Sequence, residues 1–196
     1  EEEVQLFCCQ ADVKGIVYGN ETFRFQGSTL NLLGTAYSAG KLQIAGGDLH
    51  IAEKIENASQ IELPNYMTDI LDNMKQNTGI EEIAEYNMAN VTNPTICKTT
   101  TRAWCNRVNI FADLVSNGDI SFNANVMTLG YKDPVVIASE NGDITIQATN
   151  VNGNGLIYAP NGTVTINVCD FDYKGSIIAK KINIQATYYQ HKIEDK

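Results

Sequence analysis

Several residue types are scarce in this chain of 196 residues, and each scarcity excludes a class of protein. There are 14 Lys and Arg against 23 Asp and Glu, which leaves a net charge of -9. A nucleic-acid-binding protein needs a basic surface, so no nucleic-acid partner is expected, and the negative charge also disfavours anionic lipid surfaces. No run of 18 apolar residues occurs, so we expect no membrane insertion within this segment.

Cysteine and histidine are too sparse for a structural zinc site. The chain has five Cys and two His, and it contains no C-x-x-C pair. Cys97 and Cys105 flank a short polar segment and can form a disulfide, with two buried thiols as the alternative. The odd number of cysteines leaves at least one of them free or paired outside the chain.

A short alternation of polar and apolar residues recurs seven times along the chain. Its first apolar positions are separated by 19, 19, 59, 24, 20 and 18 residues, a regularity that chance rarely produces. A period of two predicts a strand with one buried face, so each unit places two apolar side chains inward. The predicted inward pairs are Phe23/Phe25, Leu42/Ile44, Ile61/Leu63, Ile120/Phe122, Ile144/Ile146, Val164/Ile166 and Ile182/Ile184.

Turn residues repeat in phase with these strands. Asn-Gly occurs at 117–118, 141–142 and 161–162, where a sharp corner with positive φ favours Gly and Asn. Units of about 19 residues with short strands and such corners predict a β-solenoid, in which stacked coils bury a continuous apolar column. The predicted fold class is all-β, a single-stranded, right-handed parallel β-solenoid of about seven coils. An antiparallel sandwich is the alternative, but it does not require one motif to repeat in phase.

The step of 59 residues indicates an insertion within a single solenoid domain. We predict coils at about 13–63 and 110–187 and a helical and loop insertion at about 64–109. A first helix is expected to start at Pro64 or Asn65 and to end near Gly79, with Tyr66, Met67, Ile70, Leu71 and Met74 at helical spacing. A second short helix is expected to contain Ile80, Ile83, Ala84 and Met88. The Met and Tyr stripe is expected to pack on the solenoid, with a partner-binding helix as the alternative. Residues 1–9 and 187–196 are expected to cover the two ends of the stack.

The segments GLIYAPNGTVTI at 155–166 and GSIIAKKINI at 175–184 carry a family resemblance. They resemble the β-solenoid repeats of exported surface proteins of Gram-positive, often anaerobic, bacteria, whose units read roughly G-x-I-Y-A-x-G-x-I-x-I-x-G. That family also places a helical segment with a Pro-aromatic start between early and late coils, as LPNYMTDI does here. More loosely, the layout is similar to ice-binding proteins and bactofilins. The resemblance implies an extracellular, wall-associated or pilus-associated protein, and the start without Met or leader is expected to follow removal of a leader or anchor.

Acidic and histidine residues offer few candidates for chemistry, and no catalytic, cofactor-binding or metal-ligating residue is assigned. His50 lies between two apolar residues, so it is expected to point outward as a surface histidine without an orienting partner. Asp119 and Asp143 occupy matching corners, and Asp170 and Asp172 alternate along a strand. Stacked carboxylates can collect Ca²⁺, although solvated corners are the simpler interpretation.

The predicted function is that of a non-enzymatic structural or adhesive module on a bacterial cell surface or pilus, with no cofactor. Its expected partners are host or cell-wall glycan or protein, with end-to-end self-association possible in principle. A carbohydrate-active β-helix enzyme is the alternative, but it needs acidic residues grouped in a groove, and the outward positions are mainly Ser, Thr, Asn and Gln. An ice-binding or self-assembling solenoid is the second alternative, since Thr145, Thr163 and Thr165 begin an outward Thr array that other residues interrupt.

Overall fold

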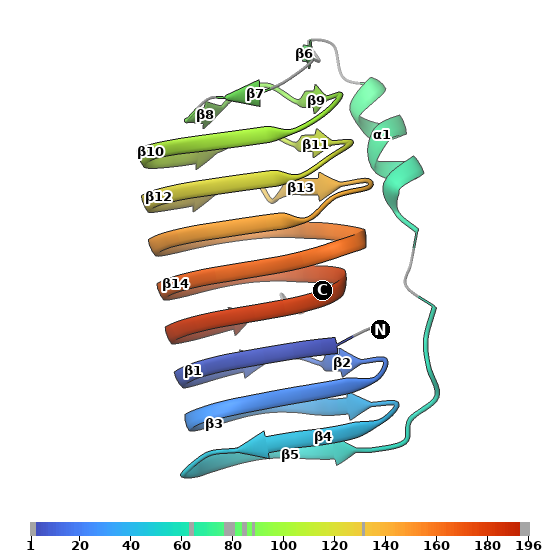
Figure 1. Cartoon of the computed structure of the whole chain (residues 1–196), viewed down its shortest axis with the longest axis vertical. Coiled ribbons are helices and arrows are strands. Elements are labelled where there is room, and N and C mark those ends of the chain that lie inside the picture. Colours follow the sequence, from blue (N-terminus) through green and yellow to red (C-terminus); the bar gives the residue numbers. More distant parts are fainter. Residues whose placement is uncertain are drawn as a thin grey trace.

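The chain forms a parallel β-solenoid of about seven turns with one short helix, as the computed structural model shows (Figure 1). The structure describes residues 3–62, 65–76, 81–83, 86–87, 89–130 and 132–192. The predicted parallel β-solenoid of about seven coils is therefore confirmed, and every strand pair in the described residues is parallel. The elements are β1 (Glu3–Lys14), β2 (Val17–Gly19), β3 (Thr22–Ser38), β4 (Lys41–Ala45), β5 (Asp48–Ile55), α1 (Met67–Lys75), β6 (Glu81–Ile83), β7 (Tyr86–Asn87), β8 (Asn90–Val91), β9 (Thr95–Cys97), β10 (Thr101–Ile110), β11 (Leu114–Ser116), β12 (Ile120–Leu129), β13 (Val135–Ser139) and β14 (Ile144–Lys192).

Each coil has three faces. The registers between neighbouring coils skip one residue at the bend between the first and second faces, for instance Cys9 in β1 and Asn106 in β10. The third face is built from separate short strands or from parts of long ones. It contains β2, β6, β9, β11, β13, the ends of β3 and β5, and residues 155–158 of β14.

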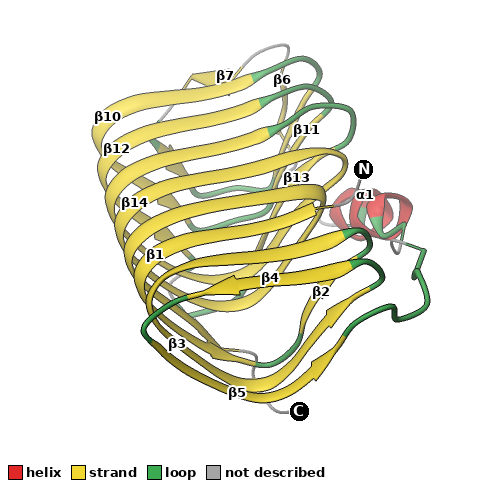
Figure 2. Cartoon of the chain, turned by 60° about the horizontal axis from the view of Figure 1, so that its bottom comes forward, coloured by secondary structure: helices red, strands yellow, loops and turns green. Residues whose placement is uncertain are grey.

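The coils are not stacked in chain order. From β1 the chain passes through β3 to β4 and β5, which close one end of the stack, and Figure 2 shows that end brought forward. Residues 56–62 then run along the outside of the stack, and α1 and β6–β9 lie near the opposite end (Figure 1). It returns through β10, β12 and β14, and the last turn of β14 pairs with β1. The first and last described strands therefore meet in the middle of the stack.

This meeting of β1 with residues 182–192 of β14, which we call the seam, is a full sheet contact. The register runs from Val4 opposite Ile182 to Lys14 opposite Lys192. The Lys181 ammonium lies 3.1 Å from the Glu3 carboxylate across it. A hydrogen bond with the Gln5 side chain lowers the pKa of Glu3, and Lys181 adds to that effect.

The capping role predicted for residues 1–9 and 187–196 is therefore wrong. Strand β1 has a neighbour on both sides, β3 and β14, so its backbone groups are satisfied within the stack and leave no open edge to cover. Residues 187–192 likewise belong to β14, and residues 193–196 lie outside the described part of the chain.

The predicted boundaries of the insertion also need correction. Strands β9 and β10, assigned to the insertion from the sequence, pair with β11 and β12 and belong to the stack. The second helix is wrong where it can be checked, because Glu81–Ile83 is strand β6, while Ile80, Ala84 and Met88 lie outside the described residues. Ile61 was predicted to point inward from a strand, but it is 48% exposed in the outer connection, and Leu63 is not described.

Four of the six other inward pairs form the core as predicted, and in the pair at the seam Ile184 is buried whereas Ile182 is half-buried. Eight of these side chains are at most 1% exposed, namely Phe23, Phe25, Ile120, Phe122, Ile144, Ile146, Val164 and Ile166. Leu42 and Ile44 stay half-buried because their strand β4 lies at the end of the stack and has β3 on one side alone.

Helix α1 packs on the third face, as the stripe of Met and Tyr predicts. Its buried residues Met67, Ile70 and Met74 contact a cluster formed by Val115, Ala138 and Tyr158. The Tyr66 backbone N–H at the start of the helix donates to the Tyr158 hydroxyl at 2.9 Å. The helix ends at Lys75, and Gly79 lies outside the described residues. Over the described chain, we find no helix with the length and apolar content needed to cross a membrane.

Candidate functional site

Trp104 is the most exposed of the large apolar side chains, at 74%. It lies on the first face of β10, where Thr101 and Ala103 point into the core and Arg102 and Trp104 point outward. The small inward residues hide the alternation that marks the other strands, so the sequence pattern assigned this segment to the insertion at about 64–109. The alternation itself was the signal that could have identified an outward indole.

Amide side chains surround the indole on the neighbouring coils. Asn123 of β12 is the register partner of Trp104, and Gln147 of β14 is the next in that column. The Asn123 amide donates to Gln147 Oε1 at 3.4 Å, and at the bend the Asn125 amide donates to Asn106 Oδ1 at 2.6 Å. Together these residues form a shallow hollow of about 410 Å³, lined by Trp104, Cys105, Asn106, Asn123, Ala124 and Asn125.

The charge beside this hollow is positive, although the chain as a whole is acidic. Arg102 is exposed on the same outward side of the first face as Trp104, two residues before it, and Arg107 is exposed at the start of the second face, directly after the bend at Asn106. Neither guanidinium forms an ion pair with a residue in the described part of the chain. We call the surface formed by Arg102, Trp104, Arg107 and the surrounding amides the Trp104 platform.

Such a platform can bind but carries no evident catalytic pair. An exposed indole presents a flat apolar surface on which the C–H face of a sugar ring can stack, and amides supply both donors and acceptors for hydroxyl groups. The arginines add fixed donors that match carboxylate or sulfate groups.

The corner carboxylates predicted from the sequence bind the backbone of the next coil. Asp119 Oδ1 accepts the backbone N–H of Asp143 at 2.9 Å, and Asp143 Oδ1 accepts that of Thr163 at 2.7 Å. Each carboxylate thus satisfies a donor at a bend where the ladder is interrupted. No group of three or more His, Cys, Asp or Glu side chains is placed to hold a metal ion in the ranges that the structure describes.

The other acidic and histidine candidates are not brought together. His50 points outward from β5 as predicted, but the expectation that it has no orienting partner is wrong, because its Nε2 lies 3.0 Å from the Asp48 carboxylate, with both side chains 66% exposed. Asp170 and Asp172 face the same side, because Phe171 between them is buried. Thr145 has Ser121 as its neighbour in the column, and Arg102 follows, so the outward Thr array is interrupted.

Cys97 and Cys105 are not joined to each other, so the disulfide considered from the sequence is not formed. The Cys97 thiol is buried and donates to the Thr100 carbonyl at 3.0 Å, whereas the Cys105 thiol donates to the Arg107 carbonyl at 2.9 Å. The two side chains are held by different local contacts on different strands, β9 and β10.

Comparisons with known proteins assign no relative to this chain. No protein-family model matches it, and no curated protein or solved structure matches it either.

Proposed function

We propose that the protein is a non-enzymatic structural and adhesive module of a bacterial cell surface or pilus, and that it adheres to glycan through the Trp104 platform. The solenoid supports the structural part of this proposal, because stacked parallel coils with a continuous apolar core make a stiff scaffold. The resemblance of the repeat to exported surface proteins supports the location.

The observation that carries the adhesive part is the exposure of Trp104 beside paired amides. Trp is enriched among the residues that contribute most of the binding energy at recognition surfaces. Binding requires no bond-breaking step, so it suits a surface with an indole and amides but no paired carboxylates. Arg102 and Arg107 favour acidic sugars over neutral ones.

The test is a glycan array followed by titration of each glycan that binds. Trp104 is the single Trp of the chain, so its fluorescence reports directly on this surface. We expect bound glycan to change that emission, and Trp104→Ala to weaken binding at least tenfold. Tyr188→Ala is the matched control, since Tyr188 is 54% exposed and lies on β14 outside the platform.

Arg102→Gln separates the charge contribution from stacking. This substitution should weaken the binding of acidic glycans several-fold and leave the binding of neutral glycans unchanged. An array without binders, or binding that survives Trp104→Ala, refutes the glycan-binding role. Release of reducing or unsaturated ends from a bound polysaccharide would instead favour the carbohydrate-active enzyme.

A further inference from the structure

The outward side chains of the first face form columns that run along the long axis of the solenoid. One column has an aromatic side chain at each end and an amide in every coil between them: Trp104, Asn123, Gln147, Asn167, Gln185 and Phe7. The step inside β14 is set by the Thr163 backbone N–H, which donates to Asp143 Oδ1 at 2.7 Å and so places Asn167 next to Gln147. Figure 1 shows these coils stacked from β10 to β1.

An arginine stands beside each of the two aromatic side chains. Arg102 lies two residues before Trp104 in the neighbouring column, where the outward residues of the following coils carry hydroxyls and amides until Arg24 of β3 is reached. The guanidinium carbon of Arg24 lies 5.4 Å from the centroid of the Phe7 ring. Each end therefore combines an aromatic ring with a guanidinium, and uncharged polar groups connect the two ends.

Carboxylates are missing from these two columns although the protein is acidic. The chain has 23 Asp and Glu against 14 Lys and Arg, yet the two columns hold neither Asp nor Glu at any described position from β10 to β4. In the flanking column, Asp119 and Asp143 accept backbone N–H groups, and Glu3 is paired with Lys181 at 3.1 Å. The two columns therefore form a strip of net positive charge that favours an anionic ligand.

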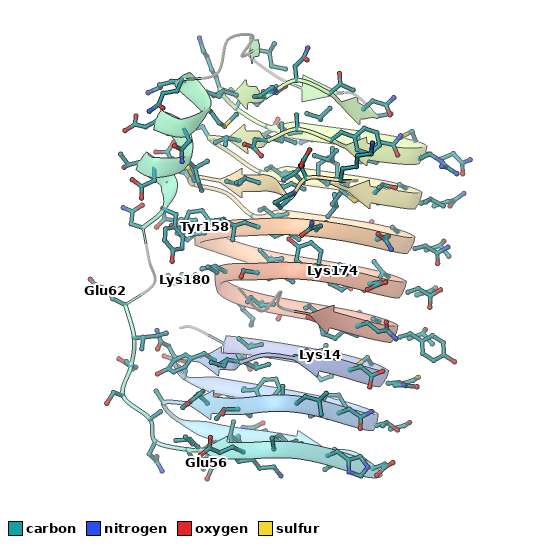
Figure 3. The ribbon with its side chains drawn as sticks, turned by 180° about the vertical axis from the view of Figure 1, so that it is seen from behind. Lys14, Glu56, Glu62, Tyr158, Lys174 and Lys180 are labelled. Atoms are coloured by element: carbon teal, nitrogen blue, oxygen red, sulfur yellow. The ribbon has the colours of Figure 1, made fainter. Side chains whose placement is uncertain are left out.

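Other basic side chains are too far round the coil to extend this strip. Lys14 and Lys174 stand at the bend between the second and third faces, and Figure 3 shows both in the view from behind. In a coil of three faces that bend is opposite the first face. An anion on the first face therefore meets Arg102 and Arg24 and not these lysines.

The separation of the two ends decides which kind of ligand can use both. Stacked coils rise about 4.8 Å each, so the five steps of the column place Trp104 and Phe7 about 24 Å apart. A single sugar covers one ring and reaches one end. A linear chain of sugars laid along the axis reaches both rings, and the amides and hydroxyls between them meet its hydroxyl groups.

We infer that the glycan bound by this protein is a linear acidic polysaccharide that lies along the solenoid axis from Trp104 to Phe7, on a surface we call the Trp104–Phe7 track. This inference rests on the glycan binding proposed for the Trp104 platform and adds Phe7 and Arg24 as a second contact. The two rings take the C–H faces of sugar rings, while Arg102 and Arg24 bind carboxylate or sulfate groups of the same chain. The second contact raises the affinity because it forms within one complex.

A purely structural role of the amides explains less of this surface. Amide ladders stabilise stacked strands, and the Asn123 amide does donate to Gln147 Oε1 at 3.4 Å. The stacking of coils, however, requires neither an exposed indole in the ladder, nor an arginine beside each ring, nor the exclusion of carboxylates. Binding of an extended acidic chain accounts for all three features.

The test measures affinity against chain length with galacturonate oligomers from the dimer to the octamer, followed by the fluorescence of Trp104. A uronic acid homopolymer carries a carboxylate on every ring, so any register offers carboxylates to both arginines. We expect the octamer to bind at least tenfold more tightly than the dimer. Equal affinities of the dimer and the octamer, or no binding of either, overturn the inference of a linear acidic chain.

Two variants remove the second contact and should fold. Phe7→Gln and Arg24→Gln introduce the amide that the same columns already carry in a neighbouring coil, at Gln185 and Gln5. Each should lower the affinity for the octamer at least fivefold and leave the affinity for the dimer unchanged. Leu33→Gln, at a position 67% exposed outside the track, is the matched control and should change neither affinity.

The outcomes separate the track from the platform on which it rests. A gain with length that survives Phe7→Gln is statistical, since a longer chain offers more registers, and it overturns the track even where Trp104→Ala still abolishes binding. If Trp104→Ala leaves the affinity for the dimer unchanged, the platform itself is wrong. A glucose oligomer of the same length should bind at least tenfold more weakly than the galacturonate octamer, and equal affinity overturns the choice of an acidic chain.

Discussion

The hydroxyl of Tyr158 should hold the first turn of α1 on the solenoid. Tyr158 is fully buried beneath the helix, and its hydroxyl accepts the Tyr66 backbone N–H at 2.9 Å. Burial raises the pKa of Tyr158, so the hydroxyl stays neutral over the ordinary pH range. Tyr158→Phe keeps the ring against the Met and Ile side chains of α1 and removes this one acceptor.

The size of the effect follows from the exposure of the donor. A hydrogen bond contributes about 0.5–1.5 kcal/mol net, and a donor left unpaired in the interior costs more. Tyr66 is 42% exposed, so water can reach its N–H group and the lower range applies. A loss of about 1 kcal/mol corresponds to roughly fivefold faster opening of the helix. Met74→Ala, at a fully buried position, should cost about 3 kcal/mol and speed opening more than a hundredfold.

Amide hydrogen exchange resolves these two effects by region. Both substitutions should accelerate exchange in α1 and leave the amides of β12 and the first coil of β14 unchanged, because α1 packs on the outside of the stack. Tyr188→Phe, at an exposed tyrosine on β14, should change neither. Equal acceleration across α1 and β12 after Tyr158→Phe would refute the view that α1 opens separately from the solenoid.

Three further predictions concern the stack itself. Ile146→Ala should lower the free energy of unfolding by about 3 kcal/mol, whereas Thr145→Ala on the outer face should change it by less than about 0.5 kcal/mol, both measured by denaturant titration. Gly155→Ala should lower the free energy of unfolding by about 2 kcal/mol or more, because φ is 140° at Gly155 and the new Cβ would meet the Val135 carbonyl. The control is Gly47→Ala, at a position with open space around it, which should leave the free energy of unfolding nearly unchanged. Burial raises the pKa of the Cys8 thiol from 9.0 to about 12, so the unfolded chain loses this proton first as pH rises. The Cys8 thiol should therefore leave the free energy of unfolding unaffected below pH 9 and lower it above pH 9 by up to about 1.4 kcal/mol per pH unit. An equal free energy of unfolding at pH 8 and pH 10.5 would contradict a raised pKa for Cys8.

The alternating pattern predicted the coils but not their order. Inward pairs such as Ile144 and Ile146 follow from side-chain periodicity, which is a local property of the backbone. Any coil with two inward apolar residues can stack on any other, so the pattern does not specify which neighbour is chosen. The placement of β1 between β3 and β14 depends on the path that residues 56–62 take along the outside, and no local periodicity encodes that path.

The candidate site was missed for a related reason. Thr101 and Ala103 are buried, but neither is large or strongly apolar, so their strand does not show the pattern of its neighbours. Conversely, Gln60 and Glu62 alternate with Ile61 as in a strand, yet the segment has no neighbouring coil to pair with and Ile61 stays exposed. Periodicity therefore predicts which side of a strand would be buried, and tertiary neighbours decide whether burial occurs.

The pairing of β1 with the last turn of β14 determines how the protein can be attached to anything else. A polypeptide joined ahead of Glu3 or beyond Lys192 would leave the molecule near the middle of the stack of coils and not at one of its ends. Tandem copies linked through these points would lie side by side, with the long axis of each solenoid perpendicular to the line of linkers. Pulling on both points would load one ladder of hydrogen bonds in shear and leave the outer coils at both tips without tension.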